Sequence, residues 1–160
     1  MALPVARFAA AVRARNPLIH SITNYVVAPF QANALSALGA SPIMADEPEE
    51  AAKLTGLSDG LVVNIGTLNQ HSINAMYLSA QAACRKNIPR VLDPVGVGAT
   101  YLRQHTVHEL LQLCRFSAIR GNAGEIAFLA EAGHRSKGID AGALEADPLQ
   151  TAQTVARRYK

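Results

Sequence analysis

The chain has 160 residues, of which 49% are hydrophobic and 17% charged, so it is long and apolar enough for one folded domain and is not a disordered chain. The net charge of +3 is small, and the basic residues form no long run, which argues against nucleic acid as a partner. No apolar stretch is long enough for a membrane span, and we expect a cytoplasmic protein.

The first fifteen residues carry three arginines and no acid, a bias that mitochondrial presequences share. Serine is absent, however, and an apolar stripe with helical spacing is formed by Val5, Phe8, Ala9 and Val12. We therefore interpret this segment as an amphipathic helix that packs on the domain.

Strand and helix patterns then alternate about five times. Apolar strands are expected at residues 18–23, 40–45, 60–65, 90–92 and 116–119. Helices are expected at about 25–38, in a short segment capped by Asp46, at 72–86, around 107–114, and from residue 125 to 132. Continuous apolar strands between helices predict an α/β domain with a parallel sheet of about five strands and helices on both faces.

The end of the sequence is predicted to be a polar loop at 134–147 followed by a helix that begins with Pro148. Its apolar stripe consists of Ala152, Val155, Ala156 and Tyr159. A helix of this kind should lead into another strand, and none follows. We expect either that the sheet closes here or that the sequence is the C-terminally truncated first part of a longer protein.

The cysteines and histidines give no metal-binding pattern. Cys84 and Cys114 both fall in expected helices and are typical of buried free thiols in a reducing compartment, with a disulfide as the alternative. His20 alternates with apolar residues and is interpreted as a hydrogen-bonded core residue. The remaining histidines are interpreted as surface residues: His71, His105, His108 and His134.

Two glycine turns carry the strongest chemical signal. Residues 91–100, Val-Leu-Asp-Pro-Val-Gly-Val-Gly-Ala-Thr, place an acid and a glycine turn between a strand and a helix. Residues 119–125, Ile-Arg-Gly-Asn-Ala-Gly-Glu, repeat this arrangement. Turns after parallel strands can face one crevice, where backbone N–H groups and helix N-termini bind anions and a carboxylate holds a metal ion through water. The pattern predicts a phosphate site.

Nucleotide-binding motifs of the common kinds are missing or incomplete around these turns. The chain has no Walker P-loop, and Gly96 and Gly98 are followed by tyrosine at position 101, so the dinucleotide fingerprint of an NAD-linked oxidoreductase is incomplete. Asp93 is also a common type of turn residue, and Glu125 is favoured by the dipole of a helix first turn, so a purely structural role stays open for both. Arg120 at the end of an apolar strand needs a paired charge or a cleft, and a phosphate would suit it.

Five segments together resemble the hydroxyethylthiazole kinases, thiamine-salvage enzymes of the ribokinase-like group. They extend over nearly all of residues 15–130: Asn16–Asn24, Ala34–Glu50 with Gly-Ala-Ser-Pro-Ile-Met-Ala-Asp at 39–46, Asn64–Asn69, Leu92–Thr100 and Ile119–Glu125. The resemblance implies a ribokinase-like domain over residues 1–160. It also implies transfer of the ATP γ-phosphate to 4-methyl-5-(2-hydroxyethyl)thiazole with the help of Mg²⁺.

The resemblance also implies roles for particular residues. Position by position, these are thiazole binding by Met44 and Asn24, ATP binding by Arg120 and Asn122, and organisation of Mg²⁺ by Asp93 and Glu125. Met44 taken alone would be core filler.

The catalytic motif that the resemblance implies is not found within these 160 residues. The family's anion hole, a glycine-rich turn with a reactive cysteine or acid, is expected beyond Lys160, so no catalytic residue is expected within the chain. The resemblance also implies a homotrimer with sites between subunits. The alternative function is a non-catalytic module that binds a thiazole-like ligand or a partner chain through an exposed sheet edge.

Overall fold

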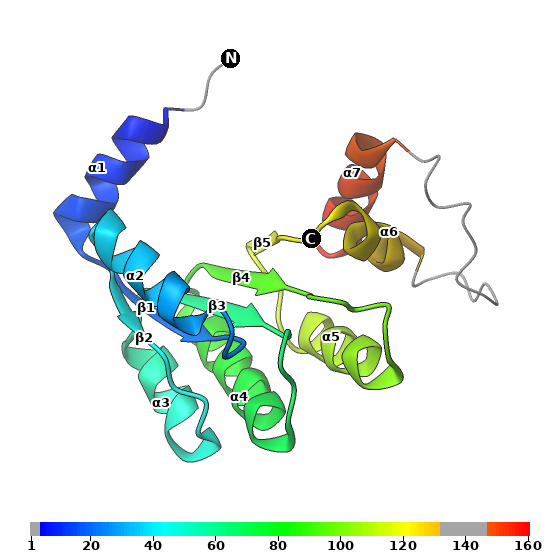
Figure 1. The fold of residues 1–160 in the computed structure, drawn as a ribbon, viewed down its shortest axis with the longest axis horizontal. Helices are drawn as coiled ribbons and strands as arrows, with labels where there is room; N and C mark the ends of the chain where they lie inside the picture. Colours follow the sequence, from blue (N-terminus) through cyan, green and yellow to red (C-terminus); the bar gives the residue numbers. More distant parts are fainter. Residues whose placement is uncertain (1–3, 132–146) are drawn as a thin grey trace.

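The computed structural model describes residues 4–131 and 147–160. Its five strands are all parallel and lie in the order β2-β1-β3-β4-β5 (Figure 1). The strands are β1 Leu18–Ile22, β2 Ser41–Ile43, β3 Gly60–Asn64, β4 Arg90–Asp93 and β5 Ala118–Ile119. The helices in the described ranges are α1 Val5–Arg15, α2 Ala28–Leu38, α3 Pro48–Leu57, α4 Gln70–Lys86, α5 Tyr101–Leu113, α6 Ala123–Glu131 and α7 Pro148–Arg158.

The direction of travel across the sheet reverses after the first two strands. The chain steps outward from β1 to β2, and then crosses β1 to reach β3, β4 and β5 in turn. Because crossovers between parallel strands are right-handed, this reversal puts α2 on one face and α3, α4 and α5 on the other, as Figure 1 shows. The predicted α/β class and the helices on both faces are thus confirmed. The reversal also defines a switch point between β1 and β3, where α/β proteins bind ligands.

The core lies between the sheet and the row formed by α3, α4 and α5. The strands contribute Ile22, Leu61, Val63 and Leu92, and the helices contribute Ala51, Met76, Ala80, Val107 and Leu110, all at most 1% exposed. Helix α4 is well defined at its start, because Asn69 and Ser72 form a reciprocal capping box. This packing fixes the ends of β3 and β4.

Several helix starts differ from the prediction. Helices α4 and α6 each begin two residues earlier than expected, at Gln70 and Ala123, and α5 begins at Tyr101, well before its predicted stripe. Helix α2 begins at Ala28, three residues later than expected, because the Asn24 side chain accepts hydrogen bonds from the backbone N–H groups of Val26 and Val27 and holds that segment as a turn. Asp46 does not cap α3, whose N-cap position is occupied by Glu47. The Asp46 carboxylate accepts a hydrogen bond from the Tyr25 hydroxyl instead, at 3.1 Å.

The apolar stripes of the two terminal helices are only partly covered in the described residues. Helix α1 forms as predicted, but none of its residues is buried, and Val5 and Phe8 are 67% and 58% exposed. In α7 only Val155 of the predicted stripe is buried. Periodicity predicts these helices correctly, but it cannot show which surface covers their apolar faces.

The cysteines and histidines are mostly as expected. Cys114 is buried, and burial raises the pKa of its thiol to about 11. The prediction of a buried Cys84 is wrong: this residue is exposed, because the neighbouring Ala82 and Ala83 occupy the buried positions at this end of α4. Both are free thiols. The predicted surface histidines in the described ranges, His71, His105 and His108, are all exposed. His134 and most of the predicted 134–147 loop lie outside the described ranges.

Among the described helices, none combines the length and apolar character that crossing a bilayer requires.

Candidate active site

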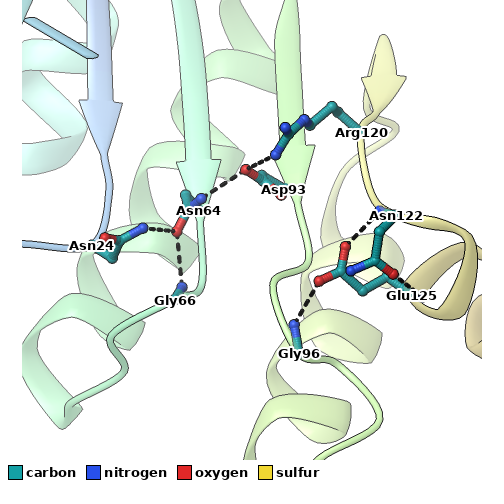
Figure 2. A network of polar contacts seen from close by, with 8 residues as sticks. All are labelled: Asn24, Asn64, Gly66, Asp93, Gly96, Arg120, Asn122 and Glu125. Atoms are coloured by element: carbon teal, nitrogen blue, oxygen red, sulfur yellow. Dashed lines mark hydrogen bonds and ion pairs between the residues drawn. The ribbon is translucent and has the colours of Figure 1, made fainter. Parts of the chain in front are cut away.

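Polar side chains from four strands meet at the carboxyl edge of the sheet. Asn24 follows β1, Asn64 ends β3, Asp93 ends β4 and Arg120 follows β5 (Figure 2). Asn64 and Asp93 are register partners, so their side chains stand next to each other. The two turns that the sequence predicts to face each other are therefore brought together by the contact of Asp93 with Arg120, and Asn24 is connected to them through Asn64.

The Asp93 carboxylate is the centre of this group. Its Oδ2 accepts a hydrogen bond from Asn64 Nδ2 at 2.7 Å and forms an ion pair with Arg120 Nη1 at 3.1 Å. The Arg120 side chain is 77% exposed and that of Asp93 only 14%, so the guanidinium reaches in from solvent and is free to change partner. The second oxygen, Asp93 Oδ1, is buried and has no hydrogen-bond partner among the described residues.

The other side of Asn64 contacts Asn24 and Gly66. Asn64 Oδ1 accepts hydrogen bonds from Asn24 Nδ2 and from the Gly66 N–H, both at 2.9 Å. Only glycine fits at position 66, because a Cβ there would lie 2.8 Å from Asn24 Nδ2 and 2.9 Å from Asn64 Oδ1. The turn after β3 is thus built around the two amide side chains.

The second glycine turn contacts the first through Glu125. Asn122 and Glu125 cap the start of α6 reciprocally: Glu125 Oε2 accepts from the Asn122 N–H at 2.8 Å, and Asn122 Oδ1 accepts from the Glu125 N–H at 2.9 Å. Glu125 Oε1 also accepts from the Gly96 N–H at 2.9 Å. Gly96 has φ +63°, a conformation that favours glycine. Glu125 therefore joins the two turns.

Arg103 is a residue that sequence reasoning missed. Its guanidinium donates to the carbonyl oxygens of Ile65 (2.8 Å), Gly66 (2.9 Å) and Val95 (2.7 Å), which belong to the loops after β3 and β4. The sequence does contain a signal for it. A cation at the N3 position of α5, behind the Thr100 cap, stands at the positive end of the helix dipole and so requires specific partners.

Met44 lies at the same edge, just after β2, and is half-buried. The loop that carries Met44 is held by a hydrogen bond from His20, which is fully buried as predicted. His20 Nε2 donates to the Ala45 carbonyl at 2.8 Å, and its Nδ1 lies 2.7 Å from Thr55 Oγ1. The position of Met44 thus depends on a buried imidazole in the core.

His20 should make stability depend on pH. Burial lowers its pKa below the usual 6.5 and outweighs the opposing effects of the Ala45 hydrogen bond and the Glu50 charge. As pH falls below about 6.5, the unfolded chain takes up a proton that the folded protein refuses, so stability falls until the lower folded pKa is reached.

We expect the free energy of unfolding, measured in urea between pH 7.5 and 5, to fall by up to about 1.4 kcal/mol per pH unit through this residue. His20→Asn should flatten the pH slope, whereas His71→Gln, at an exposed position, should leave it unchanged. An identical slope in wild type and His20→Asn would contradict the prediction.

The donor set can be tested for a fit to Mg²⁺. No cluster of three or more histidine, cysteine or acidic side chains suited to a metal occurs within the described ranges. Mg²⁺ commonly takes only one or two carboxylates together with water and substrate phosphates. The buried, unpartnered Asp93 Oδ1 suits this role. Glu125 fits only through water, because both of its oxygens already accept backbone N–H groups.

Amides at the switch point, with a carboxylate, an arginine and glycine turns at the ends of the neighbouring strands β4 and β5, are typical of α/β proteins that bind phosphorylated ligands. The sequence model of the hydroxyethylthiazole kinase family matches residues 9–160. The chain belongs to this family.

Individual relatives agree with this assignment. The hydroxyethylthiazole kinase of Pasteurella multocida (strain Pm70) is 52% identical over 149 residues, which cover 93% of this chain and 56% of that protein. That of Listeria monocytogenes serotype 4a is 51% identical over 148 residues, covering 92% and 55%. The solved structure of the hydroxyethylthiazole kinase protein from Pyrococcus horikoshii OT3 superposes with a TM-score of 0.82 at 40% identity, covering 96% of this chain and 56% of that one. The chain therefore spans about half the length of the relatives it matches.

Proposed function

We propose that this chain carries the alcohol- and phosphate-binding part of a cytoplasmic kinase that transfers the ATP γ-phosphate to 4-methyl-5-(2-hydroxyethyl)thiazole. The observation that supports this most is the meeting of Asn24, Asn64, Asp93 and Arg120 at one edge of the sheet. Phosphoryl transfer depends mainly on alignment and charge neutralisation, and this group of side chains supplies both.

Each residue has a separate task in the proposal. Asp93, with Glu125 through water, would hold Mg²⁺, which neutralises phosphate charge when bound. Arg120 exchanges its ion pair with Asp93 for the phosphates of ATP, and Asn122 binds ATP beside it. Asn24 and Met44 line the thiazole pocket. We assign no catalytic base or anion hole to the described residues. We propose that both lie in a region equivalent to the part of the relatives that this chain does not span.

We also propose a homotrimer with sites between subunits. Helix α2 buries none of its residues in the described chain, and large apolar side chains are exposed in the turn before it and in its first turn. Val26 is 87% exposed and Phe30 76% exposed. Light scattering should give three times the mass of one chain, and a monomer would contradict this part of the proposal.

The function is tested with the protein as its source cells make it. ATP, Mg²⁺ and the thiazole alcohol are supplied, and ADP and the phosphorylated thiazole are measured together. ADP formation that depends on the alcohol supports the kinase. Saturable binding of the alcohol without ADP or phosphorylated product would favour the non-catalytic module instead.

A further inference from the structure

We propose that Asn64 is a positioning residue, which holds the Asp93 carboxylate in one orientation and ties that orientation to Asn24. The inference rests on the proposed function, in which Asp93 organises Mg²⁺ and Asn24 lines the thiazole pocket. Asn64 is 6% exposed and stands between these two residues (Figure 2). It would act on the metal through Asp93, without touching either substrate.

The direction of the hydrogen bonds supports the proposal. A backbone N–H is always a donor, so the Gly66 N–H identifies the atom it contacts as the Asn64 oxygen. The Asn64 NH₂ group must then face Asp93. In the same way, the backbone N–H groups of Val26 and Val27 fix the Asn24 oxygen, so the Asn24 NH₂ group must face Asn64.

The chain of donors therefore runs one way, from the turn after β1 through two amides to the carboxylate. A carboxylate only accepts hydrogen bonds, so it ends the chain. Asn64 and Arg120 both donate to the same oxygen of Asp93. This leaves the buried Asp93 Oδ1 without a partner among the described residues and oriented by its neighbours. When Arg120 turns to a phosphate, Asn64 is the side chain that still holds Asp93.

Two variants and a control test this role. Asn64→Ser shortens the side chain, so it no longer spans the gap to Asp93. Gly66→Ala keeps both amide side chains but introduces a Cβ 2.8 Å from Asn24 Nδ2 and 2.9 Å from Asn64 Oδ1, so it displaces both amides and weakens the support of Asp93 from that side. As the control, Asn33→Ser makes the same asparagine-to-serine change as Asn64→Ser, but at an exposed position of α2.

The first measurement uses the ligand-free chain and no metal. Three-bond couplings to the Asp93 side-chain carboxyl carbon report whether χ1 occupies one rotamer. We expect one rotamer in wild type and Asn33→Ser, averaging in Asn64→Ser, and partial averaging in Gly66→Ala. A single Asp93 rotamer in a folded Asn64→Ser protein would overturn the proposal. If Asn64→Ser does not fold, the result for Gly66→Ala decides in the same way.

The second measurement titrates MnCl₂, as a paramagnetic substitute for Mg²⁺, and follows the broadening of signals near Asp93. Loss of a residue that orients a metal ligand commonly weakens metal binding by about 10-fold or more, and we expect a loss of that order in Asn64→Ser. Unchanged Mn²⁺ affinity together with an averaged Asp93 rotamer would count against the inference. If wild type binds no Mn²⁺ at all, the metal part of the proposed function fails, while the rotamer measurement still decides the role of Asn64.

Discussion

An Arg103→Met variant is expected to lose about 3 kcal/mol of unfolding free energy. The guanidinium makes hydrogen bonds to three backbone carbonyls, and hydrogen bonds of charged groups contribute about 1.5–3 kcal/mol each when they add fully. Methionine keeps much of the apolar stem but donates to none of them. The expected loss is smaller than the sum of the three hydrogen bonds, because Arg103 is half-buried and water can replace part of their contribution.

The measurement is urea unfolding of three variants beside wild type. Arg7→Met removes the same group from an exposed position of α1 and should change stability by less than about 0.5 kcal/mol. Arg103→Lys keeps the charge but not the planar fork, so it should recover only part of the loss. Equal stability of Arg103→Met and Arg7→Met would show that the Arg103 hydrogen bonds do not stabilise the loops after β3 and β4.

The predictable part of the structure is the part that local patterns determine. Apolar runs and helical stripes predict the five parallel strands and the helices between them, because burial on both faces leaves little freedom in such segments. The glycine turns after β4 and β5 are predicted to face each other, and the contact between Asp93 and Arg120 confirms that they lie together. Glycine turns and strand-ending charges are visible in the sequence itself.

The network within the site is less accessible to sequence reasoning. Asn64 is noticeable only as part of a family motif, because its partners Asn24 and Asp93 are 40 and 29 residues away and meet it only through strand register. Arg103 reaches carbonyl groups 37 and 38 residues away, and its only signal is its unfavourable place in a helix first turn. Long-range contacts of this kind follow from topology, which the sequence supplies only indirectly.

Exposed apolar side chains show a second limit. The stripe on α1 is typical of a core-facing pattern, yet Phe8 is mostly exposed in the described chain, and so is Phe30 in α2. A periodic pattern shows that a face is apolar but not what covers it. In the proposed trimer, Phe30 would be covered by a neighbouring subunit, which no single-chain argument can find.

If the chain is part of the proposed kinase, replacing Arg120 by alanine is expected to reduce kcat/KM of that kinase for ATP by about 100-fold, the loss of one or two charge-assisted hydrogen bonds to phosphate. The prediction follows from the geometry. Arg120 is 77% exposed at the carboxyl edge of β5, and among the described residues it pairs with one acid, Asp93, which it can leave when a phosphate arrives. Binding of a fluorescent ATP analogue should weaken in parallel, so the effect is visible even without turnover.

The matched control for this change is Arg115→Ala. Arg115 is also exposed and precedes the same strand, but it lies at the opposite, amino end of β5. It should keep wild-type kinetics, because the carboxyl edge holds the proposed phosphate site and the amino edge does not. Normal turnover in Arg120→Ala would remove Arg120 from the phosphate site. An equal loss in both variants would point instead to the overall positive charge of the protein, which salt would then screen to the same degree in each.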